Sequence, residues 1–270
     1  MTTPSRPTLL VLDYPGRRDE ARVRDLRLEE HGFDVRYLLG PPFQRAVTAA
    51  AYADELIEAH GPFEAVAGLL SYCMAAPIAQ HVAARLSAGT SPIPMVTFDG
   101  EPATAAALDD QYGVTVAQLA AELGAALPRV DPIDAETLAN DPTSVVAAMR
   151  SGLTKLATIA LADDEDEDDA ADDDSLADTV DGLTGFYLDW LVHLVAASNA
   201  TWPRWGGEVL NVASRDHGYT GDWPGAAGTK LMRVDVSRPE LLAQDTVGPP
   251  VVSFLNSTMS RQSTVRGGKP

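Results

Sequence analysis

The chain contains one cysteine, and the residues around it are those expected around a nucleophile. Cys73 lies in the stretch 71–76 (SYCMAA), between an apolar run and an alanine-rich segment. Where a strand turns sharply into a helix, the residue at the apex is exposed, and the residues two positions before and after it must be small. Ser71 and Ala75 meet this requirement around Cys73. Ser71 would itself be flanked by the bulky Leu69, so the pattern favours Cys73 as the nucleophile.

The segments on either side of this stretch predict a strand, a tight turn and a helix. Residues 64–70 form a short apolar run after a Gly-Pro pair, which is typical of a buried parallel strand, although a buried helical segment has a similar composition. Residues 74–86 carry Ala, Ile, Val and Leu at helical spacing. We expect the helix dipole to lower the pKa of the Cys73 thiol below its usual value of about 8.5. The alternative interpretation of Cys73 is a small buried apolar residue.

Strands alternate with helices through the first hundred residues and return near the C-terminus, which indicates an α/β protein with a mostly parallel central sheet flanked by helices. Strands are expected at 8–12, 34–39, 64–70, 208–213 and 230–236, and helices at 19–30, 46–60, 74–86 and from 245 onward. Between 101 and 188 the alternation stops. Helices are expected there at 114–123, 144–161 and 176–188, the second after the start signal Asp-Pro-Thr at 141–143.

Composition excludes several classes of function. The 270-residue chain has a net charge of −19, and ten of its acidic residues lie at 163–174. An acidic chain argues against a nucleic-acid partner, because phosphate binding requires clustered Lys and Arg. The run 163–174 is expected to be disordered, and it lacks the Gly and the spaced Glu of an EF-hand calcium loop. One cysteine is typical of a reducing cytosol, so we expect a cytoplasmic protein, and we expect no segment long enough to span a membrane.

The stretch 71–76 resembles the Gly-Tyr-Ser-Phe-Gly-Gly elbow of the α/β-hydrolase thioesterases that serve polyketide and nonribosomal peptide synthases, with Cys73 in place of serine. Residues 94–100 (PMVTFDG) resemble the next strand of that family. The resemblance implies an α/β-hydrolase fold with a core formed by residues 1–100 and 201–270. It also implies that residues 101–200 are a helical lid insertion, with the acidic run inside it.

The same resemblance implies a catalytic triad and an oxyanion hole. Asp99, at the end of the strand after the elbow, takes the position of the triad aspartate. The oxyanion donors are expected at Met74, directly after the nucleophile, and at Gly16 and Arg17, in the loop after the first strand. The family's histidine falls near Arg238, and no histidine follows His217 in the sequence. His217, in the preceding loop, is therefore the candidate base.

Relatives with a cysteine at the elbow include Dieckmann cyclases and aminoacyl transferases. The resemblance therefore implies an acyl-Cys73 intermediate, formed from a thioester on an acyl or peptidyl carrier protein and resolved by cyclisation, transfer or hydrolysis. The phosphopantetheine belongs to the carrier, so no cofactor of the chain's own is expected. The alternative is a catalytically silent relative that binds an acyl chain or a synthase module, and the lack of a late histidine favours it.

The chain offers one cluster of basic residues that could dock an acidic carrier. Its members lie on or just before the expected helix 19–30, where pairs three or four residues apart share a face. Acidic residues at 19, 20 and 25 lie among them, so a solvated helix surface is the alternative interpretation. The cluster consists of Arg17, Arg18, Arg22, Arg24 and Arg27.

Overall fold

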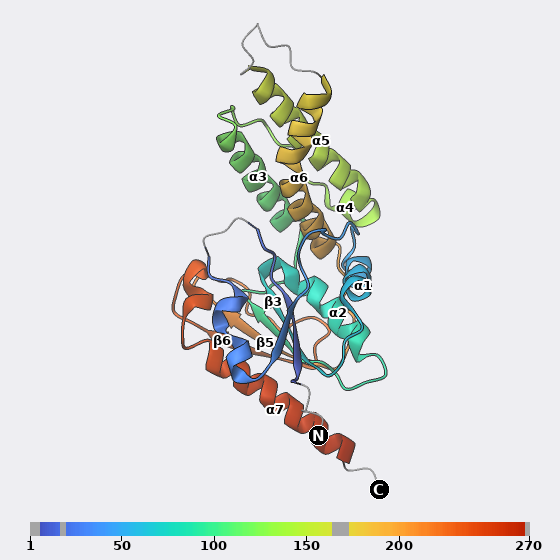
Figure 1. Ribbon diagram of the computed structural model, residues 1–270, viewed down its shortest axis with the longest axis vertical. Coiled ribbons are helices and arrows are strands. Elements are labelled where there is room, and N and C mark those ends of the chain that lie inside the picture. Colours follow the sequence, from blue (N-terminus) through green and yellow to red (C-terminus); the bar gives the residue numbers. More distant parts are fainter. Residues whose placement is uncertain (1–5, 17–19, 164–172, 268–270) are drawn as a thin grey trace. The chain divides into compact units, whose positions relative to one another are not determined.

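The structure, a computed structural model, describes residues 6–16, 20–163 and 173–267 (Figure 1). The chain divides into two compact units. The first consists of Met1–Phe43, Ala49–Pro102 and Ala200–Pro270, and the second consists of Gln44–Thr48 and Ala103–Asn199. The first unit contains Cys73, Asp99 and His217, so it carries the candidate catalytic residues.

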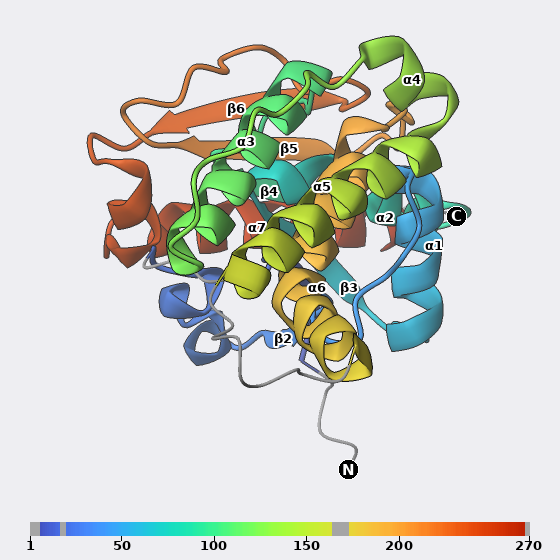
Figure 2. The same cartoon turned by 90° about the horizontal axis from the view of Figure 1, so that it is seen from above.

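A parallel sheet forms the centre of the first unit, with its strands in the order β2-β1-β3-β4-β5-β6. Every neighbouring pair in this sheet runs parallel. Figure 2 shows β2 and β6 at opposite margins. The predicted α/β class with a central parallel sheet is confirmed. The strands are β1 (Thr8–Leu12), β2 (Asp34–Tyr37), β3 (Val66–Tyr72), β4 (Met95–Phe98), β5 (Glu208–Ala213) and β6 (Gly228–Arg233).

The central strands are mostly apolar because both faces of the sheet are covered, as is usual for parallel sheets. Every residue of β1 is buried. Leu9 and Val11 belong to a core cluster that also contains Leu241, Val251 and Leu255 from the C-terminal region. The helices of this unit are α1 (Ala49–His60), α2 (Ala76–Ser87) and α7 (Gly248–Gly267), and short 3₁₀ turns are η1 (Val23–Leu26), η2 (Leu28–His31), η3 (Cys73–Ala75) and η4 (Arg238–Ala243).

The prediction of a continuous helix at 19–30 is wrong. Arg27 has a left-handed backbone (φ 48°), so the segment divides into the separate turns η1 and η2. Val23 and Leu26 are buried, which explains the helical spacing of apolar residues in the sequence. Arg22, Arg24 and Arg27 therefore do not share one helix face, and Arg17 and Arg18 lie outside the described residues. The Arg22 guanidinium donates to the carbonyl of Gly16 at 2.8 Å.

The second unit is helical, and its helices pack as the pairs α5–α6, α3–α5, α3–α6 and α4–α5. Asp141 caps the start of α5 by accepting a hydrogen bond from the Ser144 N–H at 3.2 Å, as the start signal predicts. Most of the acidic run, residues 164–172, lies outside the described residues. The helices are α3 (Ala105–Glu122), α4 (Ala135–Asn140), α5 (Pro142–Asp163) and α6 (Asp173–Ser198).

One helix contradicts the expectation that no segment could span a membrane. Pro142–Leu161, within α5, is long and apolar enough by length and composition, with a mean hydropathy of 1.2. The core helix of a globular domain can pass the same test. Here α5 packs against three other helices of the second unit, and these contacts account for part of its apolar surface.

Candidate active site

Cys73 lies at a sharp turn between β3 and α2. Its backbone is left-handed (φ 50°), a conformation that costs free energy for a residue other than glycine and that marks strained turns at functional sites. The turn η3 leads directly into α2, which has a proline in its first two positions. The Cys73 side chain is partly exposed. The local structure is therefore the strand-turn-helix elbow that the small residues around Cys73 predict.

Ser71 occupies a different environment from Cys73. It lies within β3, and its side chain is fully buried. Its hydroxyl oxygen has no hydrogen-bond partner among the described residues. A substrate cannot approach a hydroxyl inside the sheet, so the geometry supports the choice of Cys73 over Ser71.

Asp99 follows β4 just as Cys73 follows the neighbouring strand β3. Tyr72 and Phe98 are partners in the sheet register, so the residues after them emerge side by side at the carboxyl edge of the sheet. Asp99 is completely buried and also has a left-handed backbone (φ 47°). Asp99, which the resemblance singled out, therefore lies beside the elbow, and its catalytic role stays a prediction.

The carboxylate of Asp99 accepts three hydrogen bonds from two residues that lie later in the chain. Ser214, directly after β5, donates its backbone N–H at 2.7 Å and its hydroxyl at 2.8 Å. Arg238, the first residue of η4, donates from Nε at 3.2 Å. Charge-assisted bonds of this kind are about twice as strong as neutral ones. They compensate for the burial of the negative charge and fix the orientation of the arginine.

Arg238 is the positively charged residue whose field lowers the pKa of the Cys73 thiol. Its side chain is 40% exposed, and one edge of the guanidinium is held by Asp99. Burial lowers the pKa of Arg238, but the Cys73 thiolate and Asp99 outweigh burial, and the net shift is upward. The resemblance places the family's histidine near this residue. A permanently charged donor therefore occupies the region where a base was expected.

The prediction of a lowered thiol pKa is wrong. Burial raises the pKa of Cys73, and this effect exceeds the lowering by Arg238 and by the backbone N–H of Met74. Glu101 and Asp99 raise the pKa further, because their negative charges oppose a thiolate. The helix-dipole argument failed because it left out desolvation and the two carboxylates.

His217 contacts Asp99 rather than the thiol. Its side chain is 1% exposed, with Nδ1 at 3.9 Å from the Asp99 carboxylate. Nε2 lies 3.1 Å from the Gly100 carbonyl, so this nitrogen carries a proton and donates it. The role of His217 as base stays a prediction.

The expected oxyanion donors are only partly described. The backbone N–H of Met74 is directed at the Cys73 sulfur. Gly16 follows β1, which neighbours β3, and its carbonyl is held by Arg22. Arg17 lies outside the described residues. Within the described part of the chain, no group of three or more His, Cys, Asp or Glu is placed to hold a metal ion.

Three residues of this site were not assigned a role from sequence. Ser214 and Arg238 hold Asp99, and Glu101 acts on the thiol through its charge. The position of Arg238 in the family pattern was the one available signal for it. Nothing in the sequence marked Ser214, because its contact arises only when β5 pairs with β4.

Arg238 and Glu101 carry opposite charges, so removing each charge should shift the pKa of Cys73 in opposite directions. We expect Arg238→Gln to raise the pKa of Cys73 further and Glu101→Gln to lower it, since each removes one charge that acts on the thiolate. At a fixed pH below the pKa, iodoacetamide should then alkylate Arg238→Gln more slowly and Glu101→Gln faster than wild type. Because the chain has one cysteine, intact mass reports this thiol alone.

The matched control for this pair is Arg215→Gln. Arg215 pairs with Asp235 on the surface and does not act on the thiol, so its alkylation profile should follow that of wild type. Equal pH profiles for all four proteins would show that Arg238 and Glu101 do not set the ionisation of Cys73.

The parallel sheet, the elbow after β3 and the acid after β4 define an α/β-hydrolase fold. No family model matches the chain, and no curated protein matches its sequence significantly. The fold is similar to those of solved hydrolase-fold proteins.

Two solved structures illustrate the likeness. The thioesterase domain of Vlm2 is 11% identical, with a TM-score of 0.51 over 94% of this chain and 95% of that chain. A variant of a proposed epoxide hydrolase from Pseudomonas aeruginosa is 15% identical, with a TM-score of 0.50 over 95% of this chain and 90% of that chain. At these identities the likeness establishes the fold and no more.

Proposed function

We propose that this chain transfers acyl groups from carrier-bound thioesters through an acyl-Cys73 intermediate. The observation that carries the proposal is the thiol at the strained elbow beside a cation that Asp99 holds in place. A thiol in such a turn is presented to substrate, and the adjacent guanidinium stabilises the thiolate, which is the attacking species. The resemblance to thioesterases of polyketide and nonribosomal peptide synthesis supplies the substrate class.

In the first step, the Cys73 thiolate attacks the carbonyl carbon of the thioester. A carbon–sulfur bond to Cys73 forms, and the bond to the pantetheine sulfur breaks, so the pantetheine thiolate leaves and takes a proton from water. One thioester replaces another, which keeps the acyl group activated. In the second step, an amine, thiol or carbon nucleophile attacks the acyl-Cys73 carbonyl and releases the thiol.

Arg238 favours transfer or cyclisation over hydrolysis. Hydrolysis of an acyl-enzyme requires a base that removes a proton from water, and general bases contribute about 10²–10⁴-fold to such steps. A guanidinium cannot accept a proton. The acyl-Cys73 intermediate is therefore long-lived in water. It reacts with acceptors that are nucleophilic enough to attack without a base from the protein.

The alternative is a hydrolase-fold protein without catalytic activity that binds an acyl chain or a synthase module. The raised pKa of Cys73 favours it, because little thiolate is present at neutral pH. The two functions differ in whether a covalent adduct forms. The carrier protein remains the proposed partner in either case.

The deciding experiment is intact mass spectrometry after incubation with acyl-pantetheine thioesters. We expect a single acyl adduct that Cys73→Ala abolishes and Ser71→Ala retains, because Ser71 is buried within β3. The Ser71→Ala variant is the matched control for mutation in this region. An adduct that survives Cys73→Ala would sink the nucleophile assignment, and no adduct on wild type across acyl lengths and pH would favour the silent relative.

A further inference from the structure

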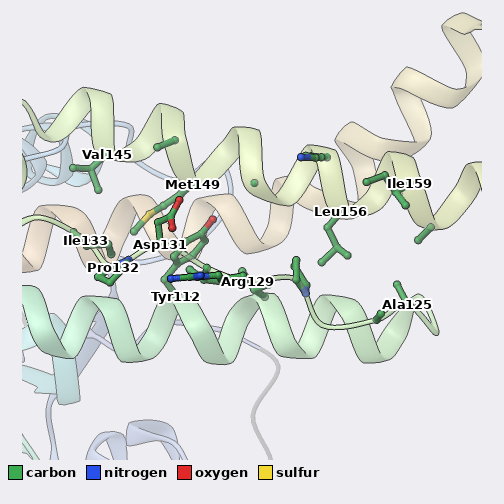
Figure 3. Close-up of a pocket in the computed structure, with 18 of the residues that line it drawn as sticks. Tyr112, Ala125, Arg129, Asp131, Pro132, Ile133, Val145, Met149, Leu156 and Ile159 are labelled. Carbon is green, nitrogen blue, oxygen red and sulfur yellow. The ribbon is translucent and has the colours of Figure 1, made fainter.

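The helical unit contains a large pocket that is separate from the residues of the elbow. Its volume is about 810 Å³, within the usual range of small-molecule sites. It is bounded by α3, by α5 and by the chain segment that joins α3 to α4 (Figure 3). All of its lining residues belong to the second unit, so the pocket is a property of that unit alone.

The wall formed by α5 contains one continuous apolar stripe. Its residues recur at intervals of four and three, so they share a single helix face. From the first to the last of them the helix rises roughly 21 Å at 1.5 Å per residue. The stripe consists of Val145, Met149, Gly152, Leu156 and Ile159. A site this long with aliphatic walls fits an extended hydrocarbon chain better than a compact or planar ligand.

A polar group lies within this apolar pocket. Tyr112 on α3 is 8% exposed, and burial raises its pKa. Its hydroxyl lies over Gly152 of α5, where an added Cβ would come within 2.4 Å of it. The glycine therefore makes the space that the hydroxyl occupies. Among the described residues no hydrogen bond to this hydroxyl is found, so it is available to a ligand.

Two cations also line the pocket. They are Arg129, on the joining segment, and Lys155, on α5, and no ion pair of either is found among the described residues. Two carboxylates share the lining with them. Asp134 is engaged at the start of α4, where it accepts from the Thr137 N–H and hydroxyl, both at 2.7 Å. Asp131 is the remaining opposing charge.

We propose that this pocket binds a straight-chain aliphatic carboxylate. The hydrocarbon chain lies along the α5 stripe, and the carboxylate accepts hydrogen bonds from Arg129 or Lys155 and from the Tyr112 hydroxyl. Buried apolar area supplies most of the affinity, and the polar groups fix the orientation. This site stands apart from the proposed function, since nothing in it requires Cys73.

The test is calorimetric titration of the full chain with octanoate, decanoate and dodecanoate below the concentrations at which they form micelles. We expect one-to-one binding that strengthens by about fourfold for each added methylene until the pocket is full. Dodecanol and dodecyltrimethylammonium test the head group. The carboxylate should bind more tightly than either, and Arg129→Gln/Lys155→Gln should remove that preference. An ammonium that binds as tightly as the carboxylate would overturn the head-group assignment.

A pair of neighbouring substitutions locates the site. Ala148 lines the pocket, whereas Ala147 does not, and both are exposed on α5. We expect Ala148→Trp to weaken dodecanoate binding at least about tenfold by filling the pocket, and Ala147→Trp to leave it unchanged. Equal effects of the two, or the absence of saturable binding to wild type, would overturn the proposal. Cys73→Ala should bind as wild type does, so this result is independent of the adduct experiment.

Discussion

The Cys73→Ser variant should lose acyl transfer by at least about 100-fold, although serine is the usual nucleophile of this fold. A thiol is far more acidic than a hydroxyl, so a small thiolate fraction forms without a base even though burial raises the pKa of Cys73, whereas a serine hydroxyl needs an adjacent base. In this site the group beside the nucleophile is Arg238, which cannot act as a base. Transfer between two small pantetheine thioesters, followed by mass spectrometry, measures the loss.

The double variant Cys73→Ser/Arg238→His is the complementary test. A histidine side chain at position 238 would lie beside Asp99, which already receives a donor from that position. We expect it to restore a measurable part of the serine activity and to increase hydrolysis relative to transfer, because the intermediate could then be attacked by activated water. The single variant Arg238→His controls for the loss of the guanidinium.

Retention of activity in Cys73→Ser, within a few-fold of wild type, would contradict this account. It would mean that a base does reach the nucleophile, and the predicted His217 would be the first candidate. In that case His217→Asn should abolish the remaining activity, since an amide cannot take up the proton.

The second large effect is expected on stability. Asp99→Asn should lower the free energy of unfolding by about 2 kcal/mol, because the hydrogen bonds that the buried carboxylate accepts from Ser214 and from the partly exposed Arg238 lose their charge assistance. The carboxylate accepts from Ser214 twice and from Arg238, and an amide can satisfy only part of that set. Asparagine tolerates the left-handed backbone at this position, so the change isolates the charge. Urea unfolding followed by tryptophan fluorescence measures it.

The matched control is Asp235→Asn. Asp235 accepts from Arg215 in an exposed ion pair, and such pairs contribute less than about 1 kcal/mol. If Asp99→Asn and Asp235→Asn unfolded at the same urea concentration, the hydrogen bonds at Asp99 would not be what stabilises the carboxyl edge of the sheet.

The parts of the site that follow strands were predictable from the sequence. A buried apolar run followed by small residues predicted β3 and the elbow, and the resemblance of residues 94–100 to the next strand of the thioesterases singled out Asp99. Parallel neighbours align their carboxyl ends, so adjacency in the sheet converts spacing along the chain into proximity. The fold class was predictable for the same reason, because alternation of strands and helices leaves few arrangements.

The parts that depend on loops and on burial were not predictable. The path of the chain after β5 and β6 decides that Arg238 binds Asp99 and acts on the thiol, and no periodicity encodes that path. The thiol pKa depends on desolvation by residues distant in sequence. At Arg27, tertiary packing overrides the helical pattern of the sequence. The pocket beside Tyr112 arises from packing between helices, which no local sequence pattern describes.

The left-handed backbones of Cys73 and Asp99 have a consequence for how such a protein can change. Each costs the fold roughly 1–2 kcal/mol, which glycine at the same position would not. At Cys73, a change to glycine would therefore relieve strain while it removed the thiol. For stability alone, glycine would be preferred to cysteine at this position. Replacing Cys73 with glycine should therefore remove the thiol and stabilise the turn together, so the thiol and the backbone strain at this position are coupled.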